Sequence, residues 1–152
     1  MSRSRTPRWL GLAIRARQWA LDEHSHALHE ARAAEDAAQR AQQAASAALD
    51  AAHAHRDGLV SRHSFGADDL QRHAAHEAAV RGQSLRAQQQ LRSAISHGDT
   101  IRTQMQEVLA QRDAYQHRLQ RVTQEADQRQ ARVDVRELDE LWLLRPARST
   151  EP

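Results

Sequence analysis

The sequence predicts an all-α fold, a long antiparallel two-helix coiled-coil hairpin with a short tip segment. Three observations predict it. Apolar residues recur in steps of four and three along residues 101–133, the pattern of a helix with one narrow apolar seam. Residues 8–57 contain no Pro and no Gly except Gly11, and their Ala, Gln, Arg and Glu favour a helix. Between these two stretches lies one convincing break, at residues 58–69.

The composition favours extended helices over a compact core. Among 152 residues there are only one Phe, one Tyr and three Trp, and Ala supplies much of the hydrophobic fraction. The formal charge of +2 combines 22 basic residues, all of them Arg, with 20 acidic residues, so the surface is mixed in charge. The absence of Cys excludes disulfides and is compatible with a reducing cytoplasm. No run approaches the ~20 apolar residues of a membrane span, so we expect no membrane insertion.

We expect residues 1–6 to be a disordered Arg-rich tail and residues 7–57 to form the first long helix. Pro7 suits the first helical turn, and Thr6 can cap it. The inner face of this helix is predicted to be Leu10, Ile14, Leu21 and Leu28, followed by Ala31, Ala34, Ala38, Ala41, Ala45, Ala48 and Ala52. A stripe of alanines lets a second helix approach closely if the facing residues are large.

The return half of the hairpin is predicted to start with a tip. The tip spans residues 58–90 and consists of a loop at residues 58–67 and the start of the return helix. A second long helix follows at residues 91–144, and a tail at residues 145–152 ends the chain. Asp68 or Asp69 can cap the return helix, and Pro146 stops it. Gly82 and Gly98 weaken it, because Gly is a poor helix former.

Two registers of the hairpin fit this pattern. In the preferred one, Ile14 faces Val133 and Ala45 faces Arg102, so that large residues meet the alanine stripe. A tight hairpin that folds at residue 62 would instead place Ala45 opposite Val80 and leave the end of the apolar seam without a partner.

Two arginines, Arg112 and Arg129, occupy seam positions in the second long helix. We expect their stems to lie along the seam and their heads to reach water or acids of the first helix. The alternative is that they set the register or contact a partner, as polar residues in coiled coils sometimes do.

No motif indicates catalysis or metal binding. The ten His residues include two pairs spaced three apart, His26 with His29 and His73 with His76. Helical metal sites usually add carboxylates from neighbouring helices, whereas the inner positions here are apolar or Ala, so we interpret these His as solvated. A two-helix stem offers no cleft for acid–base chemistry, and there is no glycine-rich phosphate loop. We therefore expect no enzyme, no cofactor and no metal site.

Apolar residues crowd the two chain ends beside a cluster of Arg that includes Arg5 and Arg8. They are Trp9, Leu10, Leu12, Trp19, Leu138, Leu141, Trp142, Leu143 and Leu144. They either cap the helix ends or bind a protein partner, and four consecutive apolar residues at 141–144 are more than one seam can hide. Near the tip, Leu59, Phe65 and Leu70 either pack locally or bind a partner.

The C-terminal run Val135-Arg136-Glu137-Leu138-Asp139-Glu140-Leu141 resembles the E-x-x-x-L-D-E end of the central stalk proteins of type III secretion and flagellar export ATPases, the FliJ/YscO/SctO family. The similarity in architecture extends over the whole chain, whereas the similarity in sequence motif is limited to this short run. It implies a non-catalytic, cytoplasmic protein, peripheral to the inner-membrane export apparatus. One end would insert into a hexameric secretion ATPase and the tip would reach the export gate protein.

The resemblance places Glu137, Leu138, Asp139 and Glu140 in the segment that faces the ATPase. With the neighbouring apolar and basic residues, the expected ATPase contacts are Arg5, Arg8, Trp9, Leu10, Glu137, Leu138, Asp139, Glu140, Leu141 and Trp142. The expected export-gate contacts are Leu59, Phe65 and Leu70. Secretion chaperones are further candidate partners.

Two other functions compete with the stalk. One is a generic coiled-coil scaffold or oligomerisation protein without an ATPase partner. The other is a nucleic-acid binder that uses its Arg residues. We disfavour nucleic acid because acids interleave with the Arg residues along both helices, whereas a phosphate-binding face needs segregated basic residues.

Overall fold

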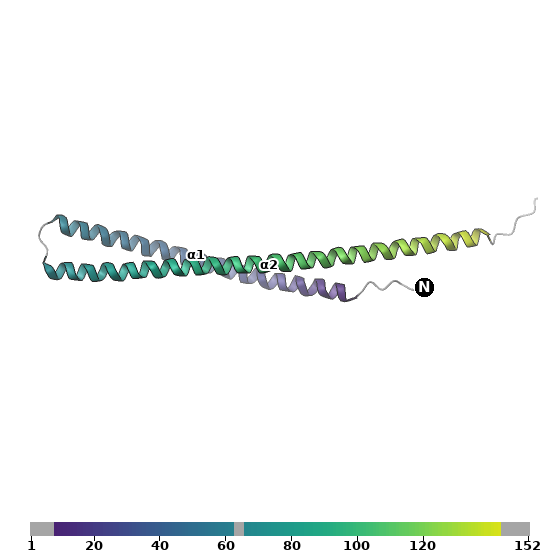
Figure 1. Cartoon of the computed structure of the whole chain (residues 1–152), viewed down its shortest axis with the longest axis horizontal. Helices are drawn as coiled ribbons and strands as arrows, with labels where there is room; N and C mark the ends of the chain where they lie inside the picture. Colours follow the sequence, from purple (N-terminus) through teal and green to yellow (C-terminus); the bar gives the residue numbers. More distant parts are fainter. Residues whose placement is uncertain (1–7, 63–65, 144–152) are drawn as a thin grey trace, which may run out of the picture. The chain divides into compact units, whose positions relative to one another are not determined.

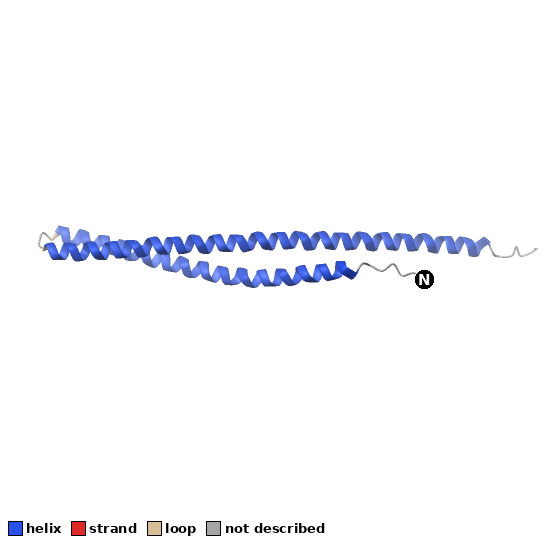
Figure 2. Ribbon diagram, turned by 60° about the horizontal axis from the view of Figure 1, so that its bottom comes forward, coloured by secondary structure: helices blue, strands red, loops and turns tan. Residues whose placement is uncertain are grey.

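The computed structural model describes residues 8–62 and 66–143, and it contains two helices, α1 at Arg8–Ser61 and α2 at Ala67–Leu143 (Figure 1). Both described ranges are helical apart from the residues next to the turn, and Figure 2 shows no strand in them. The predicted all-α hairpin of two long helices is confirmed. In these ranges, neither helix has a stretch long and apolar enough to cross a membrane.

The helix bounds differ from the predicted ones around the turn. Helix α1 continues past residue 57 through Gly58 to Ser61, and α2 runs without a break from Ala67 across the predicted tip. One Gly in a helix interior costs only about 1 kcal/mol, which packing along the rest of a long helix can offset. The predicted tails at residues 1–6 and 145–152 lie outside the described residues.

A cap at Gly66 begins α2. The backbone N–H of Gly66 donates to the Asp69 side chain at 3.3 Å, and the Gly66 carbonyl accepts from the backbone N–H of Asp69 at 3.1 Å. This reciprocal pattern satisfies donors that the first helical turn leaves without partners. Of the two predicted caps, Asp69 makes the contact with Gly66.

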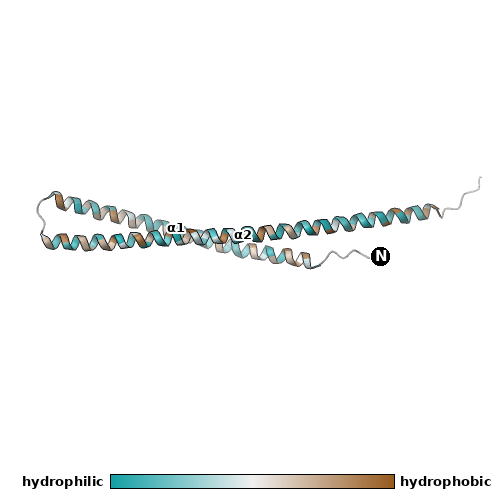
Figure 3. Ribbon diagram, viewed as in Figure 1, coloured by the Kyte–Doolittle hydropathy of each residue, from teal (hydrophilic) through white to brown (hydrophobic). Residues whose placement is uncertain are grey.

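The chain divides into two compact units. Unit 1 consists of Met1–Ala20 and Val108–Pro152, and unit 2 consists of Leu21–Glu107. Each unit therefore contains one part of α1 and one part of α2. Apolar residues occur singly or in short groups among hydrophilic ones along both helices (Figure 3), so packing depends on their spacing.

In unit 2 the sheltered residues of both helices follow alternating steps of three and four. On α1 they include Leu21, His24, Leu28, Ala31, Glu35, Ala38, Gln42, Ala45, Leu49 and Ala52. On α2 they include His73, Glu77, Val80, Ser84, Ala87, Leu91, Ala94, Gly98, Ile101 and Met105. This seven-residue repeat is the packing pattern of a coiled coil, as predicted.

The predicted alanine stripe needs one correction. Ala31, Ala38, Ala45 and Ala52 are buried or half-buried, but Ala34, Ala41 and Ala48 are exposed. Each heptad of α1 has two inner positions. One of them is an alanine, and the other is Glu35, Gln42 or Leu49 in successive heptads. The interface is therefore more polar than a continuous row of alanines.

Contacts between the helices show that the preferred register was wrong. In unit 2, Arg102 reaches Glu35 at 3.8 Å instead of facing Ala45, and Glu77 contacts His53 at 3.2 Å. The contact between Glu77 and His53 lies close to the register of the tight hairpin, and the contact between Arg102 and Glu35 lies between the two registers. The turn between the helices is short, so α2 pairs with α1 almost as soon as it begins. The preferred register would have left its first turns unpaired.

In unit 1 the first turns of α1 pack against α2 along the same heptad pattern. Leu10 is fully buried, at 0% exposure. The sheltered residues of α2 here are Val108, Arg112, Tyr115, Leu119, Val122 and Ala126, together with Asp113. The predicted seam thus ends at Ala126, and Val133 is 44% exposed instead of packing on Ile14.

The two seam arginines differ. The Arg112 guanidinium donates to the Gln18 side chain of α1 at 3.2 Å and to the neighbouring Asp113 at 3.0 Å. Its head thus reaches the first helix as expected, although the contact there is an amide and not an acid. Arg129 is exposed and pairs with Glu125 of its own helix at 3.4 Å, so its head reaches solvent, one of the two expected environments, and not an acid of α1.

Candidate functional site

The most exposed apolar part of the described chain is residues 127–143 of α2, which we name the terminal segment. Every residue in it is exposed. Its large apolar residues are Val133, Val135, Leu138, Leu141, Trp142 and Leu143. So many exposed apolar side chains on one short stretch of helix are typical of a protein-binding surface.

Four residues of this segment share one face of the helix. Ala131, Val135, Leu138 and Trp142 are spaced by four, three and four, and we name them the terminal stripe. At about 3.6 residues per turn, Val135 lies roughly two and a half turns beyond Ala126, on the opposite side of α2. The terminal stripe is therefore a second apolar face and does not continue the seam that packs on α1.

Charge changes sign along the terminal segment. Its first part carries three Arg and two Asp, and its last turns carry only acids, Glu137, Asp139 and Glu140. All eight charged side chains belong to exposed residues. The segment therefore presents an apolar face within a polarised field, which can orient a charged partner.

The predicted ATPase contacts on α1 fall into different environments. Leu10 is completely buried, so its side chain packs within unit 1 and offers no surface to a partner. Trp9 is 48% exposed, yet its ring meets Tyr115 edge-on. Arg8 is exposed, and Arg5 lies outside the described residues. The exposed candidates on α1 are thus Arg8 and part of Trp9.

Two of the three predicted export-gate residues, Leu59 and Leu70, are described by the structure, one on each helix beside the turn. Leu59 is half-buried near the end of α1, and Leu70 is exposed in the first turn of α2. Phe65 lies outside the described residues. Of the two export-gate candidates that the structure describes, Leu70 is the exposed one.

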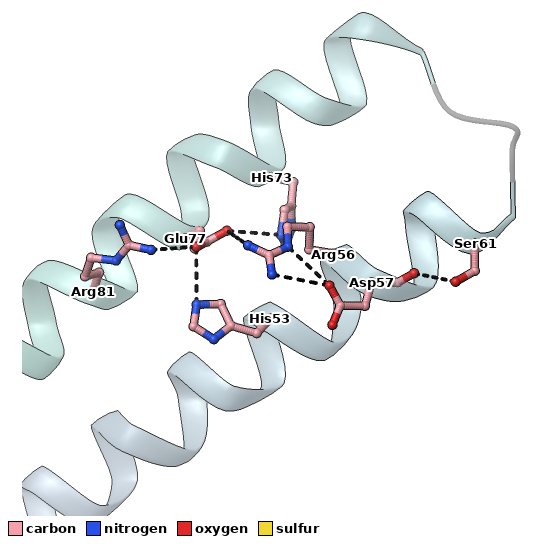
Figure 4. Close-up of polar contacts among 7 residues, drawn as sticks. All are labelled: His53, Arg56, Asp57, Ser61, His73, Glu77 and Arg81. Atoms are coloured by element: carbon pink, nitrogen blue, oxygen red, sulfur yellow. Dashed lines mark hydrogen bonds and ion pairs between the residues drawn. The ribbon is translucent and has the colours of Figure 1, made fainter.

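A polar cluster joins the helices near this turn (Figure 4). The Glu77 carboxylate of α2, with a side chain 13% exposed, contacts His53 at 3.2 Å and Arg56 at 3.6 Å, both from α1. Its own helix adds Arg81 at 2.8 Å and His73 at 3.8 Å. The cluster supplies one acid with several basic neighbours, which suits it to fixing the helix register.

His73 is not solvated, contrary to the prediction for the histidines. It is buried and its ring lies 5.4 Å from the ring of His55. Its Nε2 atom has no hydrogen-bond partner, because the Glu77 oxygen at 3.8 Å is beyond hydrogen-bond distance. The interpretation as solvated was wrong here because residue 73 occupies a heptad position, and it holds for exposed His76, His26 and His29.

Sequence reasoning missed the Glu77 cluster. Glu77 falls at an inner heptad position, with His73 four residues before it and Arg81 four residues after it. An acid between two basic residues at that spacing on an inner face was the available signal. Within the described ranges, no group of three or more His, Asp or Glu side chains is placed to hold a metal ion.

Comparisons of the chain with protein-family models, with curated proteins and with solved structures found no match. The fold and the exposed terminal segment instead define a class, a helical-hairpin protein whose return helix carries an apolar face beyond its packed seam.

Proposed function

We propose that this protein is the non-catalytic stalk of a type III secretion ATPase complex, cytoplasmic and peripheral to the inner-membrane export apparatus. The terminal segment binds the hexameric ATPase, and residues beside the turn, Leu59 and Leu70 among them, contact the export gate. One observation carries the proposal. The run at residues 135–141 that resembles the stalk family is exposed throughout.

The chemistry of the terminal segment suits a protein pocket. Leu138, Leu141 and Trp142 are between 57% and 69% exposed, and burying one such side chain contributes roughly 1.5–3 kcal/mol. Glu137, Asp139 and Glu140 beside them favour a basic rim on the partner. Apolar anchors would supply affinity, and the acids would supply orientation and a faster encounter.

A helical hairpin also suits a regulatory role in a ring of identical subunits. Two antiparallel helices lack sixfold symmetry, so each ATPase subunit would meet a different part of their surface. A ligand that binds one conformation more tightly than another shifts the population toward the conformation that it binds more tightly. The stalk would thus bias neighbouring subunits into different states without contributing a catalytic group.

The test uses a purified hexameric secretion ATPase, the intact chain and a chain that ends at Arg136. Residues 127–143 are all exposed, so among the described residues this truncation removes only exposed ones. We expect binding in a pulldown and stimulation of ATP hydrolysis with the intact chain, and loss of both with the truncated chain. Undiminished binding by the truncated chain would refute the assignment of the terminal segment.

A matched pair of substitutions separates the surface from general damage. Leu138→Asp changes the terminal segment, and Leu85→Asp changes an equally exposed leucine in unit 2, at 57% and 55% exposure. We expect Leu138→Asp to weaken ATPase binding by about tenfold or more, as for an apolar anchor, and Leu85→Asp to leave it unchanged. Equal effects would contradict the proposal.

The alternative is a coiled-coil scaffold without an ATPase partner. The heptad spacing of sheltered residues on both helices favours it, because this spacing serves any coiled coil. If the intact chain binds no secretion ATPase and leaves its activity unchanged, the scaffold becomes the better explanation.

A further inference from the structure

We propose that the terminal stripe is a self-association surface, through which two copies of this chain pair their α2 helices antiparallel over residues 131–142. This inference does not depend on the proposed function, since it rests on the exposure, spacing, size and charge of the residues in the terminal segment. The occupant it assigns to the stripe is a second copy of the chain.

Exposure and spacing give the terminal stripe the pattern of an exposed coiled-coil face. Val135, Leu138 and Trp142 are 57%, 57% and 69% exposed, and Ala131 is also exposed. Their spacing of four, three and four is that of inner positions in a helix pair. Since this face lies opposite the seam used by α1, pairing with a second copy leaves the hairpin unchanged.

Side-chain sizes along the stripe are self-complementary only when the helices run antiparallel. Ala131 then lies opposite Trp142 of the second copy, and Val135 lies opposite Leu138 of the second copy, each pair occurring twice about a two-fold axis. The smallest residue thus meets the largest, and the two intermediate residues meet each other, as a well-filled interface requires.

Charges beside the stripe favour the same arrangement. Arg132 and Asp139 are seven residues apart, so they flank the stripe on one side. In the antiparallel pair, Arg132 lies near Asp139 of the second copy, and this contact also occurs twice.

A parallel pair fits less well. It would place Trp142 against Trp142 of the second copy and Ala131 against Ala131, crowding one end of the interface and leaving a void at the other. It would also bring Asp134 near Asp139 of the second copy, which puts like charges across the interface. Size and charge therefore select the same orientation.

The proposed pairing has a consequence for partner binding. It covers Leu138 and Trp142, which the proposed function assigns to the ATPase. The interface is short, so we expect a weak dimer that forms at high concentration and gives way to a tighter partner. If the proposed function holds, self-association and ATPase binding are mutually exclusive.

Sedimentation equilibrium of the intact chain alone tests the dimer. We expect reversible dimerisation at micromolar to millimolar concentration, weakened about tenfold or more by Leu138→Asp because a buried charge replaces an apolar contact. Val133→Asp is the matched control, since Val133 is exposed in the same segment but lies outside the stripe. A chain that remains monomeric throughout, or equal effects of both substitutions, would overturn the proposal.

The absence of native Cys allows a clean test of orientation. The variants Ala131→Cys and Trp142→Cys are oxidised separately and as a mixture. In the antiparallel pair, equivalent positions lie roughly 16 Å apart along the axis, too far for a disulfide. We expect a bridged dimer only in the mixture. Efficient bridging of either variant alone would refute the antiparallel arrangement.

Charge reversal provides a second readout of the same interface. Arg132→Asp and Asp139→Arg should each weaken the dimer, because each places like charges opposite one another, and the double variant should restore it. These experiments need only the chain itself. A failure here leaves ATPase binding open, and a failure of ATPase binding leaves the dimer open, so the two proposals can be refuted separately.

Discussion

The indole of Trp9 meets the ring of Tyr115 edge to face, with centroids 6.4 Å apart and planes at 87°. The Arg118 guanidinium lies over the same indole, 5.3 Å from its centroid. Tyr115 and Arg118 both belong to α2, so Trp9 ties the first turn of α1 to its partner helix. A residue expected to bind the ATPase thus also contributes to packing within unit 1.

Trp9→Ala should therefore loosen the start of α1. Loss of the aromatic pair and of the cation–π contact is expected to cost about 1–2 kcal/mol of unfolding free energy. Hydrogen exchange of the first turns of α1 should accelerate. Trp19→Ala is the control, because Trp19 is 66% exposed and no ring contact of its side chain is described; similar exchange in the two variants would contradict this role for Trp9.

The register of unit 2 can be tested at Glu35 and Arg102, which lie 3.8 Å apart and are partly exposed. Glu35→Arg should lower the unfolding free energy by about 0.5–1 kcal/mol, because solvent screens such a pair. Combining it with Arg102→Glu should recover part of that loss. A double-mutant cycle in urea measures the coupling, and zero coupling would argue against this register. Arg102 also pairs with Asp99 at 2.6 Å, so recovery should be incomplete.

Heptad spacing made the fold predictable, because only the two helical periods and one break were needed to infer a hairpin. The same spacing says little about register. Alanine fits opposite many residues, so matching Ala45 to a large partner did not select the true alignment. The short turn decides the register instead, since pairing starts directly after it.

The candidate site was predictable in composition but not in burial. The exposed acids and apolar residues of the terminal segment follow from the sequence, but the full burial of Leu10 depends on where α2 passes α1. For the same reason the contacts of Glu77 with His53 and Arg56 could not be inferred without the register.

Replacing His73 should stabilise unit 2. The His73 Nε2 atom is buried without a hydrogen-bond partner, at an inner heptad position. Leucine at this position removes the unsatisfied polar atom and adds apolar contact, so His73→Leu should raise the unfolding free energy by about 1–2 kcal/mol. His76→Leu, on an exposed face, should change it little. Urea unfolding followed by circular dichroism measures both, and destabilisation by His73→Leu would mean that its polar contacts outweigh burial.

Gly98 allows a test of adding a side chain at an inner position that now has none. It is buried inside α2, and a Cβ atom there would meet Arg102 at 3.8 Å and Glu35 at 3.9 Å, which are ordinary contact distances. Gly98→Ala should therefore gain the helix propensity of Ala, about 1 kcal/mol, without strain.

Gly82→Ala is the matched variant, because its Cβ would meet only the flexible end of Arg86 at 3.7 Å. Both substitutions should raise the midpoint of thermal unfolding by similar amounts, because the gain in each comes from the backbone. If Gly82→Ala stabilises the protein and Gly98→Ala does not, the expectation for Gly98 is wrong. The added methyl group would then be too large for the space between the helices, and the glycine would be needed for their close approach.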